Sequence, residues 1–204
     1  MAITINGSGT ITGLSAGGLP DGSVVADDLA SSLDLTGKTV TLPSGTGGKV
    51  LNVYSDMSDT TATSLGGNTY HDIPNLSVTF TPSSTNNKVL VFGHVSWWIN
   101  SSNEIGIRLL RGSTDIGSSS QSGSWNLLSN SMDHQSNGTT WMVNSTPFNF
   151  LDSPATTSSV TYKPQIAMGG PTGGSYVWIN RGSQTSGTDS IAAVSVITAM
   201  EIAP

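Results

Sequence analysis

Apolar and polar residues alternate along much of the chain after residue 67, with the period of two that is typical of β-strands. The longest apolar run, residues 88–99, is apolar on both faces of a strand, and Gly93 within it marks an expected bend or bulge. Turns about every 8–15 residues predict an all-β fold, an antiparallel β-sandwich of jelly-roll type. The other strands are expected over residues 76–80, 104–110, 139–143, 147–150, 160–162, 165–168, 175–179 and 191–202.

The first 55 residues differ from the rest, because they contain no Trp, no Phe and a single Tyr. Ile3, Ile5 and Ile11 alternate with Thr around a glycine-rich turn, which predicts a small β-hairpin. A flexible tail and an oligomerising arm both fit the sparse apolar residues that follow. Their regular recurrence favours an arm in which several copies bury Val24, Leu29, Leu33, Leu35, Val40 and Leu42 against one another. The pattern also fits one short helix and two strands, over residues 23–33, 38–42 and 49–54.

The change of pattern predicts three regions: an arm over residues 1–55, a junction over 56–67 and a sandwich over 68–204. A sandwich of this length can bury an ordinary core. A fragment that begins near residue 66 is therefore expected to fold without the arm.

The amino-acid composition excludes several classes of protein. Charged residues make up 10% of the chain, whereas it has 33 Ser, 25 Thr and 24 Gly, so a helix-rich protein is excluded. The absence of Cys excludes disulfides, thiol catalysis and Cys-bound zinc. The net charge is -6 and the seven Lys and Arg form no basic run, so no nucleic acid is expected as a partner.

The N-terminus, Met1-Ala-Ile-Thr-Ile, has neither the basic region nor the apolar stretch of a signal peptide. The longest apolar stretches are also shorter than a membrane span requires. We therefore expect no signal peptide and no membrane insertion.

Candidate catalytic groups are few and scattered. No Gly-x-Ser-x-Gly turn leads into a helix, and His94 in its apolar strand favours a core or interface imidazole. His71-Asp72 and Asp133-His134 are adjacent pairs that point to opposite faces of a strand, so each is a weak candidate for a metal site. The sequence predicts no enzyme, cofactor or metal, with a polysaccharide-degrading enzyme as the less favoured alternative. The sandwich carboxylates share no short motif: Asp72, Asp115, Asp133, Asp152, Asp189, Glu104 and Glu201.

The five Trp residues carry more information. Because Trp97 and Trp98 are adjacent in a strand, one is expected in the core and the other on the outside or against a partner. Trp141 and Trp178 alternate within strands and are expected in the core. Trp125 follows a polar Ser/Gly loop, where a rigid apolar ring suits contact with a sugar or another surface, and packing inside the protein is the alternative.

Short motifs along the chain carry a further signal. In the N-terminal region they are Gly17-Gly-Leu-Pro-Asp-Gly-Ser-Val24, Ala26-Asp-Asp-Leu29 and Leu35-Thr-Gly-Lys-Thr-Val-Thr-Leu-Pro-Ser-Gly45. Later they are Val78-Thr-Phe-Thr-Pro-Ser-Ser84, Lys88-Val-Leu-Val91, Leu110-Arg-Gly-Ser-Thr-Asp-Ile116, Leu151-Asp-Ser-Pro-Ala-Thr-Thr-Ser-Ser-Val-Thr-Tyr162, Ile179-Asn-Arg181 and Ile197-Thr-Ala-Met-Glu-Ile202. In order and number they resemble the tail-fibre-like proteins of tailed bacteriophages, notably marine ones.

The resemblance implies a virion structural protein without enzymatic activity, typically a homotrimer, that is assembled in the host cytoplasm. Its N-terminal arm would dock on another virion protein, such as a tail adaptor, baseplate or capsid protein. Its distal β domain would contact a glycan or protein of the host surface during attachment. The shortness of the chain leaves open a tail fibre, a tip subunit, and a head fibre or decoration protein on the capsid without a receptor role.

This interpretation places docking in residues 1–20, oligomerisation in residues 21–55 and host contact in the loop region 117–138. The candidate docking residues are Ile3, Ile5, Ile11 and Leu14. The candidate host contacts are Trp125, Asp133 and His134.

Overall fold

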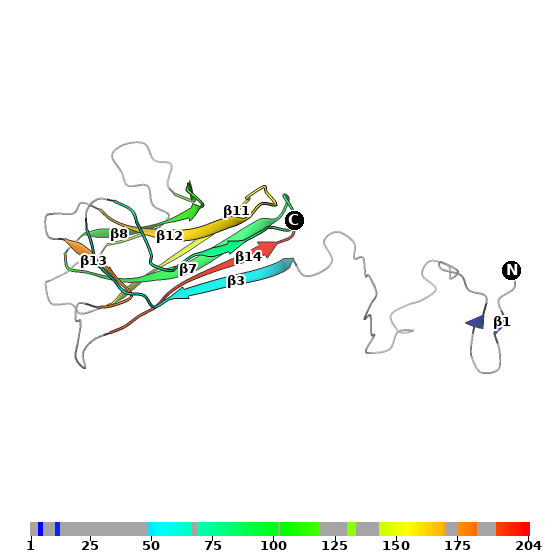
Figure 1. The fold of residues 1–204 in the computed structure, drawn as a ribbon, viewed down its shortest axis with the longest axis horizontal. Coiled ribbons are helices and arrows are strands. Elements are labelled where there is room, and N and C mark those ends of the chain that lie inside the picture. Colours follow the sequence, from blue (N-terminus) through cyan, green and yellow to red (C-terminus); the bar gives the residue numbers. More distant parts are fainter. Residues whose placement is uncertain are drawn as a thin grey trace. The chain divides into compact units, whose positions relative to one another are not determined.

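The computed structural model describes residues 4–5, 11–12, 49–66, 69–101, 103–118, 130–133, 143–169, 175–182 and 191–204 (Figure 1). The chain divides into two units, Met1–Thr46 and Gly47–Pro204. All regular elements among the described residues are strands, which confirms the all-β class. In chain order they are β1 (Thr4–Ile5), β2 (Ile11–Thr12), β3 (Val50–Ser58), β4 (Ala62–Gly66), β5 (His71–Asp72), β6 (Val78–Phe80), β7 (Lys88–Ile99), β8 (Glu104–Arg111), β9 (Thr114–Ile116), β10 (Asn130–Asp133), β11 (Asn144–Asp152), β12 (Val160–Gly169), β13 (Tyr176–Ile179) and β14 (Ser195–Ile202).

The first unit contains the predicted hairpin. β1 and β2 pair antiparallel, with Ile5 opposite Ile11. The glycine-rich residues between these two strands lie outside the described residues. The helix and strand expected over 23–33 and 38–42, like Ile3 and Leu14, lie outside the described residues.

The second unit is an antiparallel β-sandwich of two six-stranded sheets, as the alternation predicts. Sheet I has the order β3-β14-β7-β13-β4, and β11 pairs with β7. Sheet II has the order β10-β8-β12-β5, with β6 on β12 and β9 on β8. The two sheets pack over one apolar core, as aligned sandwiches do.

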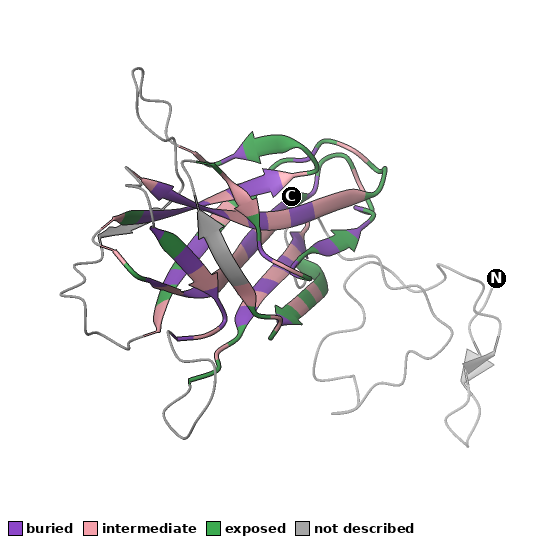
Figure 2. Ribbon diagram, turned by 60° about the vertical axis from the view of Figure 1, so that its left-hand side comes forward, coloured by how far each residue is buried: buried purple, intermediate pink, exposed green. Residues whose placement is uncertain are grey.

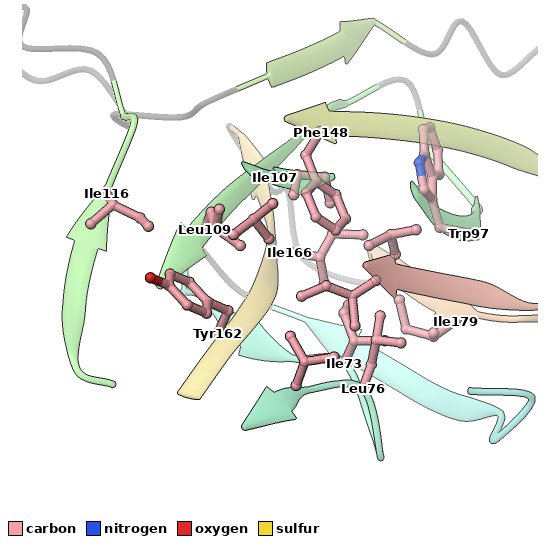
Figure 3. Packing of buried hydrophobic residues seen from close by; sticks show 14 of the residues in the cluster. Ile73, Leu76, Trp97, Ile107, Leu109, Ile116, Phe148, Tyr162, Ile166 and Ile179 are labelled. Carbon is pink, nitrogen blue, oxygen red and sulfur yellow. The ribbon is translucent and has the colours of Figure 1, made fainter. Parts of the chain in front are cut away.

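The core is built from alternate residues of the strands (Figure 2). In sheet I, every second residue of β7 points inward, and Trp97 is fully buried. Its indole Nε1 donates a hydrogen bond of 2.7 Å to Oγ1 of Thr146, so the one polar atom of this ring is satisfied. Sheet II contributes Ile107, Ile166 and other residues to the same cluster (Figure 3).

The boundary of the sandwich lies earlier in the chain than the sequence indicated. The strand expected over 49–54 is β3, which pairs with β14 along its whole length. The ring of Tyr54 stacks on Phe80 at 4.5 Å, and this contact ties β3 to the core. Residues 56–67, expected as a junction, contribute the end of β3 and the strand β4.

Two further expectations change in detail. The segments expected as separate strands over 160–162 and 165–168 form one strand, β12, and the last strand begins at Ser195 rather than at 191. β7 keeps an unbroken register with β11 and β14 through Gly93, so the bulge considered there is absent from these two described ladders. A Cβ at Gly93 would lie 2.0 Å from the carbonyl oxygen of Val196, which shows that this glycine permits a close approach.

Candidate interaction surfaces

The outer face of sheet I carries two apolar rows, and a more polar row lies between them that consists of Ser55, Thr198, Phe92 and Asn149. Residues of β3, β14, β7 and β11 that alternate with core residues form rows across this face, and one row consists of Val53, Met200, Leu90 and Leu151. Antiparallel sandwiches usually alternate apolar inward and polar outward residues, so a row of four apolar outward residues departs from the rule. We call this surface the sheet I outer face.

A second row of the sheet I outer face runs through Met57, Val196, His94 and Pro147. Val53 is 56% exposed and Met57 is 59% exposed, so the edge strand β3 presents large apolar side chains to the outside. Of the outward residues of β3, β7, β11 and β14, only Lys88 and His94 carry titratable groups. The face therefore has little charge with which to hold water or a charged partner.

Three aromatic rings lie on the same face at one end of the sandwich. The Trp98 and Trp178 rings are 4.6 Å apart, and Tyr176 meets Trp178 edge-on at 6.1 Å. Trp97 and Trp98 thus point to opposite sides of β7, as predicted, but Trp178 was expected in the core and is half-buried on the outer face. The Trp178 ring packs on the ring of Trp98, its cross-strand neighbour. The alternation of residues within β13 does not by itself predict this contact. Trp141 lies outside the described residues.

The aromatic end lies opposite the end where the chain enters the sandwich. Lys49 accepts a backbone hydrogen bond from Ala203, so the start of β3 and the C-terminus lie side by side (Figure 1). Lys88 pairs with Ile202 at that end, and ten residues of β7 at about 3.3 Å each put Trp98 roughly 33 Å away.

The outer face of sheet II has the opposite character. Asp72 on β5 accepts hydrogen bonds from Lys163 at 2.7 Å and from Gln165 at 2.6 Å. Gln165 in turn accepts one from Arg108, whose guanidinium lies 3.4 Å above the ring centre of Tyr70. Although its partial burial acts to raise the pKa of Asp72, these donors lower it below the ordinary value.

These contacts bear on the candidate metal site at His71-Asp72. Asp72 is engaged by Lys163, and the Nε2 atom of His71 lies 3.0 Å from Oγ1 of Thr69. In the described part of the chain, no three His, Asp or Glu side chains come together as metal ligands would.

The described residues include no helix that is long and apolar enough to cross a membrane.

The structure places one of the three candidate host contacts. Asp133 ends β10, opposite Glu104 of β8, whereas Trp125 and His134 lie outside the described residues. β8 follows β7 after a short connection, so Asp133 lies at the same end of the sandwich as Trp98. The three residues remain predictions.

Sequence reasoning missed the sheet I outer face. Its one signal was the run 88–99, apolar on both faces. The other residues of the face belong to three different strands, and only the register of those strands brings them together: Val53, Met57, Met200 and Leu151.

Comparison with known proteins gives no family. No family model matches the chain, and no curated protein matches it. Among solved structures, the chain is similar to the VP2 subviral particle of infectious bursal disease virus, with 17% identity and a TM-score of 0.42 over 86% of this chain and 41% of that chain. T=1 particles derived from infectious bursal virus match with 17% identity and a TM-score of 0.38 over 87% of this chain and 48% of that chain. The chain thus spans less than half the length of these proteins, and a likeness of this degree carries no conclusion about function.

Proposed function

We propose that this chain is a structural subunit of a virus particle, a fibre-like protein of a tailed bacteriophage that contacts the host surface during attachment. The observation that carries the proposal is the pair of exposed apolar rows on the sheet I outer face, because the solvated face of an antiparallel sheet usually carries polar residues. A subunit of an assembly needs such a face for its neighbours. The ordered fibre-like motifs along the chain support the same function, with a homotrimer as the assembly.

In this proposal the two ends of the chain have different tasks. The N-terminal unit docks on another virion protein through the hairpin that contains Ile5 and Ile11. The aromatic end of the sandwich and the region 117–138 contact a host glycan or protein. Shallow contacts of this kind gain affinity when an assembly presents several copies at once.

The main alternative is a head fibre or decoration protein on the capsid, without a receptor role. A polysaccharide-degrading tailspike is less favoured, because it requires two carboxylates that converge on a cleft. Among the described carboxylates, Asp72 and Asp152 are each bound to a cation, and Glu201 is enclosed by hydrogen-bond donors.

Immunogold electron microscopy of intact particles, with antibody raised against the purified full-length protein, tests the proposal. Label at the tail or baseplate is the expected result. Label spread over the capsid would favour the decoration protein. Unlabelled particles would overturn the proposed virion role.

A further inference from the structure

We infer that the sheet I outer face is the surface through which copies of this chain pack against one another. The inference rests on the assembly proposed above and names the surface that forms it. Three features of the face point to a second copy of the chain as its occupant: its exposed apolar side chains, its lack of carboxylates among the described residues, and the position of β3 at the edge of the sheet.

The exposed side chains of the face are of the kind that an interface buries. Large apolar side chains on β3, β11 and β13 are between 39% and 59% exposed: Val50, Leu51, Val53, Met57, Leu151 and Tyr176. Exposed apolar side chains that gather on one sheet mark a surface for interaction with another protein.

The charge distribution favours a second copy over a partner of another kind. The chain has a net charge of -6, so two copies repel each other wherever their acidic groups meet. The outward strand positions of sheet I carry Lys88 and His94 but no carboxylate among the described residues. Two such faces can approach without burying a carboxylate, whereas the network around Asp72 and Arg108 on sheet II would have to be desolvated.

The edge strand gives a third argument. Among the described strands, β3 is the last of sheet I on its side and pairs with β14. Soluble proteins protect long apolar edge strands with charge, proline or a cover, because an open edge recruits other chains. The outward positions of β3 are Leu51, Val53, Ser55 and Met57, none of them charged, so a neighbouring copy is the cover that fits.

Sedimentation of the full-length protein tests the inference with two double variants. Val53→Glu with Met57→Glu places two charges on the sheet I outer face, at side chains that are more than half exposed and outside the core. Thr114→Glu with Thr157→Glu adds the same two charges at exposed positions of β9 and of the loop after β11. Circular dichroism verifies that each variant is folded.

We expect the wild type and the Thr114/Thr157 variant to sediment as the same oligomer. The Val53/Met57 variant should dissociate, because its oligomer would bury like charges against one another. Its dissociation constant should rise roughly tenfold or more. A folded Val53/Met57 variant that stays oligomeric would overturn this surface while leaving the proposed assembly intact. A monomeric wild type would also overturn it, and particle labelling would then decide the virion role on its own.

Discussion

Glu201 shows how the sandwich holds a fully buried carboxylate in a chain with few charges. Its oxygens accept hydrogen bonds from Nδ2 of Asn52 at 2.9 Å, from Nδ2 of Asn87 at 2.7 Å, and from the backbone N–H and hydroxyl of Ser83. Burial alone would raise the pKa of this carboxyl, but the donors outweigh it and lower the pKa of Glu201 to about 2. The carboxylate thus fixes β14 to β3 and to the turn before β7.

This pKa predicts an acid-sensitive contribution to stability. The folded value lies below the ordinary 4.5, so the contribution is complete above that pH and is lost as the pH falls toward 2. Glu201→Gln should lower the free energy of unfolding at pH 7 by about 1–3 kcal/mol, because the buried donors lose their charged acceptor. Urea denaturation at pH 7 and pH 3 measures this loss, which should be smaller at pH 3. An equal loss at both pH values would contradict the account.

A second buried carboxylate joins the two sheets. Asp152 of β11 binds the Arg111 guanidinium of β8 at 2.7 Å and accepts a hydrogen bond of 2.7 Å from the phenol of Tyr162 on β12. Burial raises the pKa of Tyr162, and the hydrogen bond to Asp152 raises it further, so the phenol remains a donor. Asp152 therefore has a structural role.

At the scale of the element, β3 decides where the folding unit begins. It covers one edge of β14, stacks Tyr54 on Phe80 and supplies Asn52 to Glu201. A fragment that begins at residue 66 lacks all three contacts, although the sequence alone indicated that it would fold. The structure thus favours a start at Gly47.

Two fragments test the role of β3. Residues 47–204 should unfold cooperatively with a thermal midpoint close to that of the full chain. Residues 66–204 should melt about 10 °C lower or more, because the loss of several kcal/mol shifts a domain of this size by that amount. Thermal unfolding followed by circular dichroism compares them, and equal midpoints would show that β3 contributes little.

The sequence predicted what depends on local pattern. The alternation identified the all-β sandwich and the hairpin at Ile5 and Ile11, and the apolar run matched β7 over 88–99. The alternation did not identify which strands pair when they are distant in the chain. Asn52 lies opposite Glu201, so the pairing of β3 with β14 has no local signal in the sequence. The alternation of apolar and polar residues also does not show which face of a strand the core covers. For this reason Trp178 was expected in the core.

Only part of the candidate site could be predicted from the sequence. The pattern marked the strand 88–99 as apolar on both faces. The surface itself arises from register, which brings residues of β3, β14 and β11 beside Leu90. Isolated loop residues such as Trp125 were easier to single out than residues whose role depends on their neighbours.

At the scale of the whole sandwich, the two outer faces differ in chemistry. The sheet I outer face carries two exposed apolar rows and little charge, whereas sheet II carries the network of Asp72, Lys163, Gln165 and Arg108. A sandwich of this kind has one side suited to its own copies and one side suited to water. The aromatic end with Trp98 and Trp178 lies opposite the end of the sandwich at which β3 begins.

Thiol labelling of single-cysteine variants tests the central claim most directly, because the chain has no Cys of its own. Met57→Cys reports on the sheet I outer face, and Thr114→Cys reports on an exposed position of sheet II. We predict that maleimide reacts more slowly with Met57→Cys as the full-length protein is concentrated through its association range, while Thr114→Cys reacts at a constant rate. If both thiols react at unchanged rates at every concentration, copies of the chain do not pack through this face.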